Sequence, residues 1–103
     1  MPWYHDIYHF LRLRVYPKAA KAKDKRALRQ LAARFVICGE TLYKRSVDGM
    51  LLLCLDRASA NRVMREVHAR VCGPHMGGHM LAHKIMRTDY FWLTMKTDCC
   101  QFV

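Results

Sequence analysis

The chain has 103 residues, enough for one small domain or one domain with an arm, and too few for a large enzyme. Its 18 lysines and arginines against 8 aspartates and glutamates give a net charge of +10, which favours a nucleic-acid partner over a basic surface that only aids solubility or meets an acidic protein. The five cysteines, an odd number without a disulfide-like pattern, and the lack of a signal peptide predict a reducing, intracellular compartment rather than secretion.

The first segment is predicted to be an amphipathic helix followed by a connector. Apolar side chains recur at helical spacing up to about residue 14: Trp3, Ile7, Phe10 and Leu11. Residues 15–23 include Pro17 and show no useful periodicity, which indicates a linker. We therefore expect residues 1–23 to form an N-terminal helical arm.

A second helix is predicted to begin at Asp24, whose carboxylate can cap its N-terminus. Its expected apolar face consists of Ala27, Leu28, Leu31, Ala32 and Phe35. The opposite face is basic, and we select Lys25, Arg26 and Arg29 as candidates for phosphate contacts that weaken as salt rises. The alternative for this face is a solvated helix surface.

Three short apolar runs follow and predict a three-stranded antiparallel meander over residues 35–38, 41–45 and 50–55. Asp48-Gly49 lies between the second and third runs and is a strong hairpin signal, because both central residues of the favoured turn need positive φ. Cys38 and Cys54 fall in these strands and are expected to be small core residues. The helix and the meander together make a predicted segment of residues 24–57. No apolar run is long enough for a membrane span.

The remaining residues, 58–103, are predicted to form a helical, histidine-containing lobe like a zinc finger, which makes the fold class α+β. Asp56 or Ser59 is expected to cap a helix that carries His68 near its end, with an inner face of Val63, Met64, Val67 and Val71. Further helices are expected from about His79 to Arg87 and from Thr97 or Asp98 onward.

Two histidines, His68 and His75, flank the break at Gly73-Pro74. A continuous helix would hold them about 10 Å apart along its axis, too far for one zinc ion. Glycine and proline allow the chain to turn back, so that both imidazoles can reach one metal. A structural zinc site takes four ligands, and the sequence contains no C-x-x-C to supply the other two.

Four motifs follow one another in this region: Val67-His68, Gly73-Pro74-His75-Met76-Gly77, residues 81–85 (Leu-Ala-His-Lys-Ile) and Tyr90-Phe91-Trp92. In this order they resemble the zinc-binding N-terminal domain of integrases from plant Gypsy-class LTR retrotransposons, in which a C-x-x-C pair follows a further helix. The preceding hairpin is similar to the family's N-terminal extension. The segment from Pro2 to Leu11 resembles the stretch that joins the ribonuclease H domain to integrase in these elements.

The resemblance implies that His68 and His75 are zinc ligands and that Tyr90, Phe91 and Trp92 pack a core around the metal. It implies a polyprotein fragment, truncated before the C-x-x-C, that binds the ends of the element's DNA and takes part in integrase self-association. No membrane or small-molecule substrate is implied. The family's catalytic core is a separate domain, so no enzymatic activity is expected. Lys84 and Arg87 are the best candidates for DNA contacts in this lobe.

Several alternatives accompany this interpretation. The chain could be a decayed retroelement reading frame whose product is a small basic interaction domain with no selected activity. His79 and His83 share a helical face and could hold a metal, although solvent or phosphate contact is favoured. Cys72 is not assigned as a ligand by the resemblance. The adjacent Cys99 and Cys100 would diverge on a helix and make poor partners for one metal.

Overall fold

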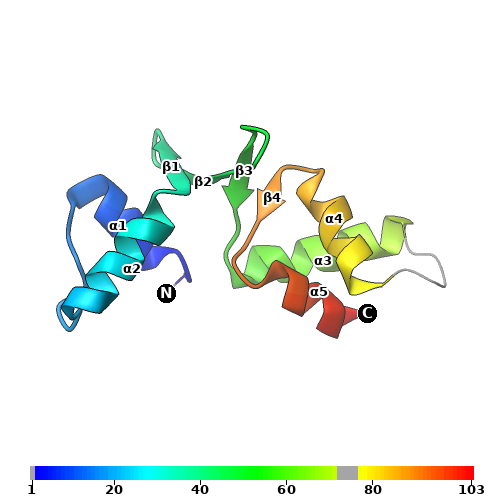
Figure 1. Ribbon diagram of the computed structural model, residues 1–103. Helices are drawn as coiled ribbons and strands as arrows, with labels where there is room; N and C mark the ends of the chain where they lie inside the picture. The colour runs from blue at the N-terminus through cyan, green and yellow to red at the C-terminus, as the bar shows by residue number, and fades with distance from the viewer. Residues whose placement is uncertain (1, 72–76) are drawn as a thin grey trace. The chain divides into compact units, whose positions relative to one another are not determined.

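The computed structural model describes residues 2–71 and 77–103, with the side chain of Val71 left out (Figure 1). These residues form five helices and a four-stranded sheet, which confirms the predicted α+β class. The chain divides into two compact units, Met1–Leu53 and Cys54–Val103. Within the described ranges, no helix combines the length and the apolar character needed to cross a bilayer.

The first unit begins with α1 (His5–Leu13), the amphipathic helix expected from the sequence. Ile7 and Phe10 are its buried residues, at the spacing of one helical face. The helix packs on α2 (Ala22–Ala32) and on the first strand, and the Tyr8 hydroxyl donates a hydrogen bond to the Glu40 carbonyl at 3.0 Å. The helix of the expected N-terminal arm therefore packs within the first unit.

The start of α2 differs from the prediction. The helix begins at Ala22, so Asp24 lies in its first turn and is not the N-cap residue. There the Asp24 carboxylate accepts a hydrogen bond from the Lys21 backbone N–H at 3.1 Å, one of the donors that a helix start leaves without a helical partner. Ala32 is buried as expected, whereas Ala27 is exposed and its predicted place on the apolar face is wrong.

The predicted antiparallel meander is confirmed. Its strands are β1 (Phe35–Cys38), β2 (Thr41–Arg45) and β3 (Leu51–Cys54), and β1 pairs with β2 while β2 pairs with β3. Phe35, Leu42 and Leu52 are buried and provide the core of this part. Cys54 is buried as expected, but Cys38 is exposed, because it is the last residue of β1 before the turn.

The second hairpin turn differs from the expected type. Among its residues only Gly49 has positive φ, at 87°, and Asp48 does not. The Gly49 N–H donates to the Ser46 carbonyl at 3.1 Å, and the Ser46 N–H donates to the Met50 carbonyl at 2.8 Å. This is a three-residue loop, which needs a left-handed residue only at its end. The glycine was correctly identified as essential to the turn, but the loop is one residue longer than predicted.

The second unit consists of three helices and a short strand. The helices are α3 (Arg57–Val71), α4 (Gly78–Met86) and α5 (Met95–Phe102), and the strand is β4 (Tyr90–Phe91). Asp56 caps α3 as one of the two predicted candidates, since its carboxylate accepts the Ser59 N–H at 2.9 Å. Helix α5 begins two residues before Thr97, the earlier of the two starts predicted for it.

Strand β4 was not predicted. The sheet order is β1-β2-β3-β4, and in the second unit the Leu55 N–H donates to the Phe91 carbonyl at 2.9 Å. Asp89 precedes the strand with φ of 68°, which redirects the chain after α4. The largest fully buried side chains of this unit are Leu81, Ile85, Trp92 and Cys99. They come from α4, α5 and the segment between them, which pack together (Figure 1).

The contact between α4 and α5 depends on Gly78. A Cβ atom added at this position would collide with the backbone of Cys100, meeting its Cα and lying 2.5 Å from its N. Only a residue without a Cβ allows the two helices to approach this closely. The structure thus gives Gly78 a packing role.

Candidate functional site

The structure places one of the two predicted zinc ligands. His68 lies near the end of α3, where it is half-buried. Its ring meets the ring of Phe102 from α5 edge to face, with centroids 5.3 Å apart and planes at 77°. His75 and Cys72 lie outside the described residues. The described part of the predicted site is therefore a histidine held between the ends of two helices.

The described residues alone do not make a zinc site. In residues 2–71 and 77–103 no three histidine, cysteine, aspartate or glutamate side chains gather closely enough to hold a metal ion. Burial raises the pKa of the Cys99 thiol to about 11, so the thiolate forms less readily here than in an exposed cysteine. Cys100 is exposed and diverges from Cys99, as predicted for adjacent helical residues. A zinc site would need ligands beyond those described.

The aromatic motif of the lobe is anchored by an aspartate that sequence reasoning missed. Trp92 is 1% exposed, and its indole Nε1 donates to Asp98 Oδ2 at 2.8 Å. The same oxygen accepts the Thr94 hydroxyl at 2.6 Å and lies 2.9 Å from the Arg57 guanidinium. The available signal was the six-residue separation of Trp92 and Asp98, which places an acceptor in the helix that follows the tryptophan. Tyr90 and Phe91 are half-buried beside this core.

A basic hollow lies between the C-terminal parts of α3 and α4. Its volume is about 270 Å³, and it is lined by Val67, Arg70, Lys84, Arg87 and Thr88. Three of these residues are cations, and none is acidic. Lys84 is half-buried, while Arg70 and Arg87 are exposed. Both residues selected in this lobe, Lys84 and Arg87, are therefore brought together, and Arg70 joins them. Cations at helix C-termini also interact favourably with the helix dipole, which accounts for part of this clustering.

Two of the three cations selected on α2, Lys25 and Arg29, contact the aromatic residue Tyr16. The Lys25 Nζ lies 5.2 Å from the centroid of the Tyr16 ring, and Arg29 Nη1 donates to the Tyr16 hydroxyl at 3.0 Å. Arg26 is exposed. Tyr16 in turn packs on Phe10, with ring centroids 5.1 Å apart. The guanidinium of Arg29 has five N–H donors, so its bond to Tyr16 leaves others for a phosphate.

The remaining histidines of the lobe, His79 and His83, are exposed on α4. No protein-family model, curated protein or solved structure matches the chain. The function must therefore be argued from the chemistry of the described surfaces and from the sequence motifs.

Proposed function

We propose that this chain is a nucleic-acid-binding and assembly module of the integrase zinc-binding type, encoded as part of a retrotransposon polyprotein. The observation that carries the proposal is the basic hollow of Arg70, Lys84 and Arg87 on the lobe that contains the His68 and Trp92 motifs. We place it inside the cell, in the nucleus or a cytoplasmic particle, with the ends of the element's DNA and other integrase subunits as partners.

The chemistry of the hollow suits a phosphate group. Arginine can donate two parallel hydrogen bonds to a phosphate, and lysine binds it as a point charge. Because no acidic side chain lines the hollow, no internal ion pair competes with an incoming anion. Contacts of this kind position a protein on nucleic acid without reading its sequence. The cations on α2 would add further phosphate contacts from the first unit.

A binding experiment tests the hollow. Replacing Arg70, Lys84 and Arg87 together by glutamine should remove up to three phosphate contacts and flatten the log–log salt dependence of duplex DNA binding by about 2 to 3. Fluorescence anisotropy with a labelled duplex at several salt concentrations measures this slope. The matched control replaces Arg45, Arg62 and Lys96 by glutamine. These residues are exposed, and their replacement removes the same amount of charge away from the hollow. If both triple variants change the slope equally, net charge alone accounts for binding and the hollow is not an interface.

Zinc is a separate part of the proposal. Zinc titration, followed by circular dichroism, should be carried out on this chain and on a version extended through a C-x-x-C pair. The extended version should gain helicity and stability with zinc, because a full ligand set contributes its binding free energy to folding. His68→Ala should abolish that gain. If the extended chain gains nothing, or if His68→Ala makes no difference to it, the assignment of His68 as a ligand is wrong.

A further inference from the structure

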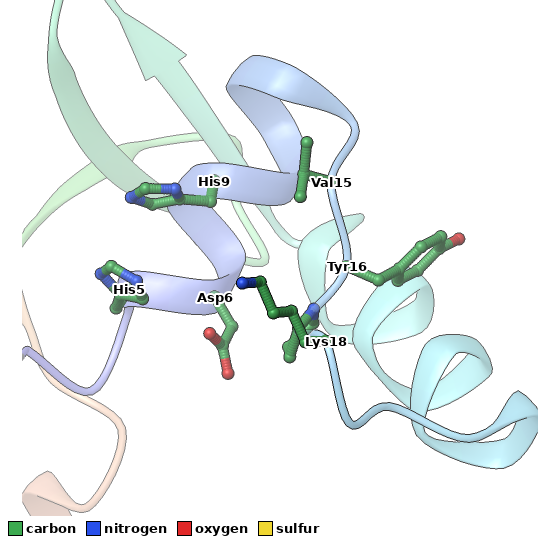
Figure 2. Close-up of a pocket in the computed structure, with 7 residues that line it drawn as sticks. His5, Asp6, His9, Val15, Tyr16 and Lys18 are labelled. Atoms are coloured by element: carbon green, nitrogen blue, oxygen red, sulfur yellow. The ribbon is translucent and has the colours of Figure 1, made fainter.

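A second pair of histidines lies in the first unit, on α1. His5 and His9 are four residues apart, and their rings lie one above the other with centroids 4.1 Å apart and planes at 35°. Figure 2 shows both rings projecting from the same side of the helix. They line a hollow of about 170 Å³ together with Asp6, Val15, Tyr16, Pro17 and Lys18.

Both imidazoles are available as ligands. Within residues 2–71 and 77–103, neither ring takes part in a hydrogen bond or an ion pair. The two rings contact each other, and His9 also contacts the ring of Tyr8. His9 is exposed and His5 is half-buried. Neutral imidazole is the commonest side-chain metal ligand, and two histidines at this helical spacing are the arrangement by which a single helix offers two nitrogens to one ion.

The spacing of the rings favours one coordination geometry. With a metal–nitrogen bond of about 2.0 Å, an imidazole centroid lies about 3.2 Å from the ion, so two rings at 90° have centroids about 4.5 Å apart and two rings at the tetrahedral angle about 5.2 Å apart. The observed 4.1 Å is nearer to the first value. The rings must therefore move apart to admit an ion, and the movement is smaller for a tetragonal ion, such as Cu²⁺ or Ni²⁺, than for tetrahedral Zn²⁺.

We propose that His5 and His9 form a two-ligand site for a divalent transition-metal ion of the copper and nickel type. No third histidine, cysteine, aspartate or glutamate of the described residues joins them, and Figure 2 shows the Asp6 carboxylate directed away from the rings. Water fills the other positions, and the hollow has room for several molecules at about 30 Å³ each. The ammonium group of Lys18 lines the same hollow and weakens the site by repulsion.

Titration of the full chain with Ni²⁺ tests this proposal, because Ni²⁺ reports the site without oxidising the thiols. Isothermal calorimetry should show binding that the double variant His5→Gln, His9→Gln weakens at least tenfold, with circular dichroism verifying that the fold is kept. Ni²⁺ should also broaden the ring signals of these two histidines in NMR spectra before those of the other histidines. Zn²⁺ should bind more weakly than Ni²⁺ at this site.

The matched control is His79→Gln with His83→Gln, a pair at the same spacing on α4 for which the structure shows no ring contact with each other within the described residues. In this control variant, the dissociation constant of the tightest Ni²⁺ site should stay within about twofold of that of the unchanged chain. If the two double variants lose affinity equally, or if the α1 variant binds Ni²⁺ as well as the unchanged chain, the site is not on α1. His5 and His9 lie on α1, outside the lobe, so the result of this titration is independent of the tests of DNA and zinc binding.

Discussion

Asp98 is the residue on which several side chains of the second unit depend. One of its oxygens accepts from Trp92 and Thr94 and pairs with Arg57, and the Asp98 side chain is only 15% exposed. The Trp92 side chain is fully buried, so its indole N–H needs an acceptor. Leaving a buried donor without a partner lowers stability by more than a satisfied hydrogen bond raises it. The aspartate therefore joins α3, α5 and the aromatic segment into one structure.

Replacing Asp98 by alanine should lower the free energy of unfolding by about 2 to 3 kcal/mol, because it leaves the buried Trp92 Nε1 without its acceptor and removes the partner of Arg57. Urea unfolding followed by tryptophan fluorescence measures the change. Asp98→Asn keeps an acceptor oxygen and should cost less. Equal stability of the alanine variant and the unchanged chain would contradict the role given to this residue.

The stability of the second unit should depend on pH through the same residue. Burial alone raises the pKa of Asp98, but hydrogen bonds from Thr94 and Trp92 and the pairing with Arg57 outweigh it and hold this pKa below its ordinary value of 3.8. The stabilisation is therefore complete above about pH 5 and is lost as the pH falls through the folded pKa. Urea midpoints at pH 7 and pH 3 measure this loss, which should be smaller in Asp98→Asn.

The close contact between α4 and α5 at Gly78 should contribute to stability. Gly78→Ala should lower the free energy of unfolding by about 1 to 3 kcal/mol, because its Cβ would overlap backbone atoms of Cys100, which cannot move aside as a flexible side chain can. Gly77→Ala is the control, since a Cβ there meets nothing within 4 Å and its φ of −86° suits any residue. Thermal unfolding measures the stability of both variants. If Gly77→Ala destabilises the chain as much as Gly78→Ala does, the packing role given to Gly78 is wrong.

The elements that were predicted correctly are those with a strong local pattern. Helix α1 and the meander follow from the recurrence of apolar residues, and Gly49 marks its turn because only glycine adopts its φ readily. Strand β4 has two residues, too few for any periodicity, and is recognised only through its pairing. Asp24 was assigned as the cap because aspartate is favoured both at the N-cap and in the first turn of a helix, where its carboxylate accepts from the N–H of the N-cap residue instead.

Only part of each candidate site could be predicted from the sequence. Lys84 and Arg87 could be selected because they lie on one predicted helix, whereas Arg70 joins them from α3 through packing that has no local signature. Asp98 did have a local signal, its six-residue separation from Trp92, but the hydrogen bond between them forms only when the segment before α5 folds back. The Tyr16 contacts of Lys25 and Arg29 depend on how the connector folds back onto α2. Sequence patterns thus identify charged faces, and tertiary packing decides which charges meet.

For the whole molecule, the proposed binding to nucleic acid would depend mainly on salt, because the net charge is +10. If the cations of the hollow and of α2 contact about six phosphates, affinity should fall about a thousandfold between 50 and 200 mM salt. Anisotropy titrations with single- and double-stranded probes test this dependence. Binding of equal strength at both salt concentrations would contradict an interaction dominated by phosphates.

The cysteines offer a way to measure the molecule as a whole. Cys38 in the first unit and Cys100 in the second are exposed, whereas Cys54 and Cys99 are buried. With Cys72 replaced by serine, thiol-selective dyes at neutral pH should attach to the two exposed positions and place one fluorophore in each unit. Energy transfer between the dyes would then report the distance between the units, and its change on adding DNA would show whether binding fixes their arrangement.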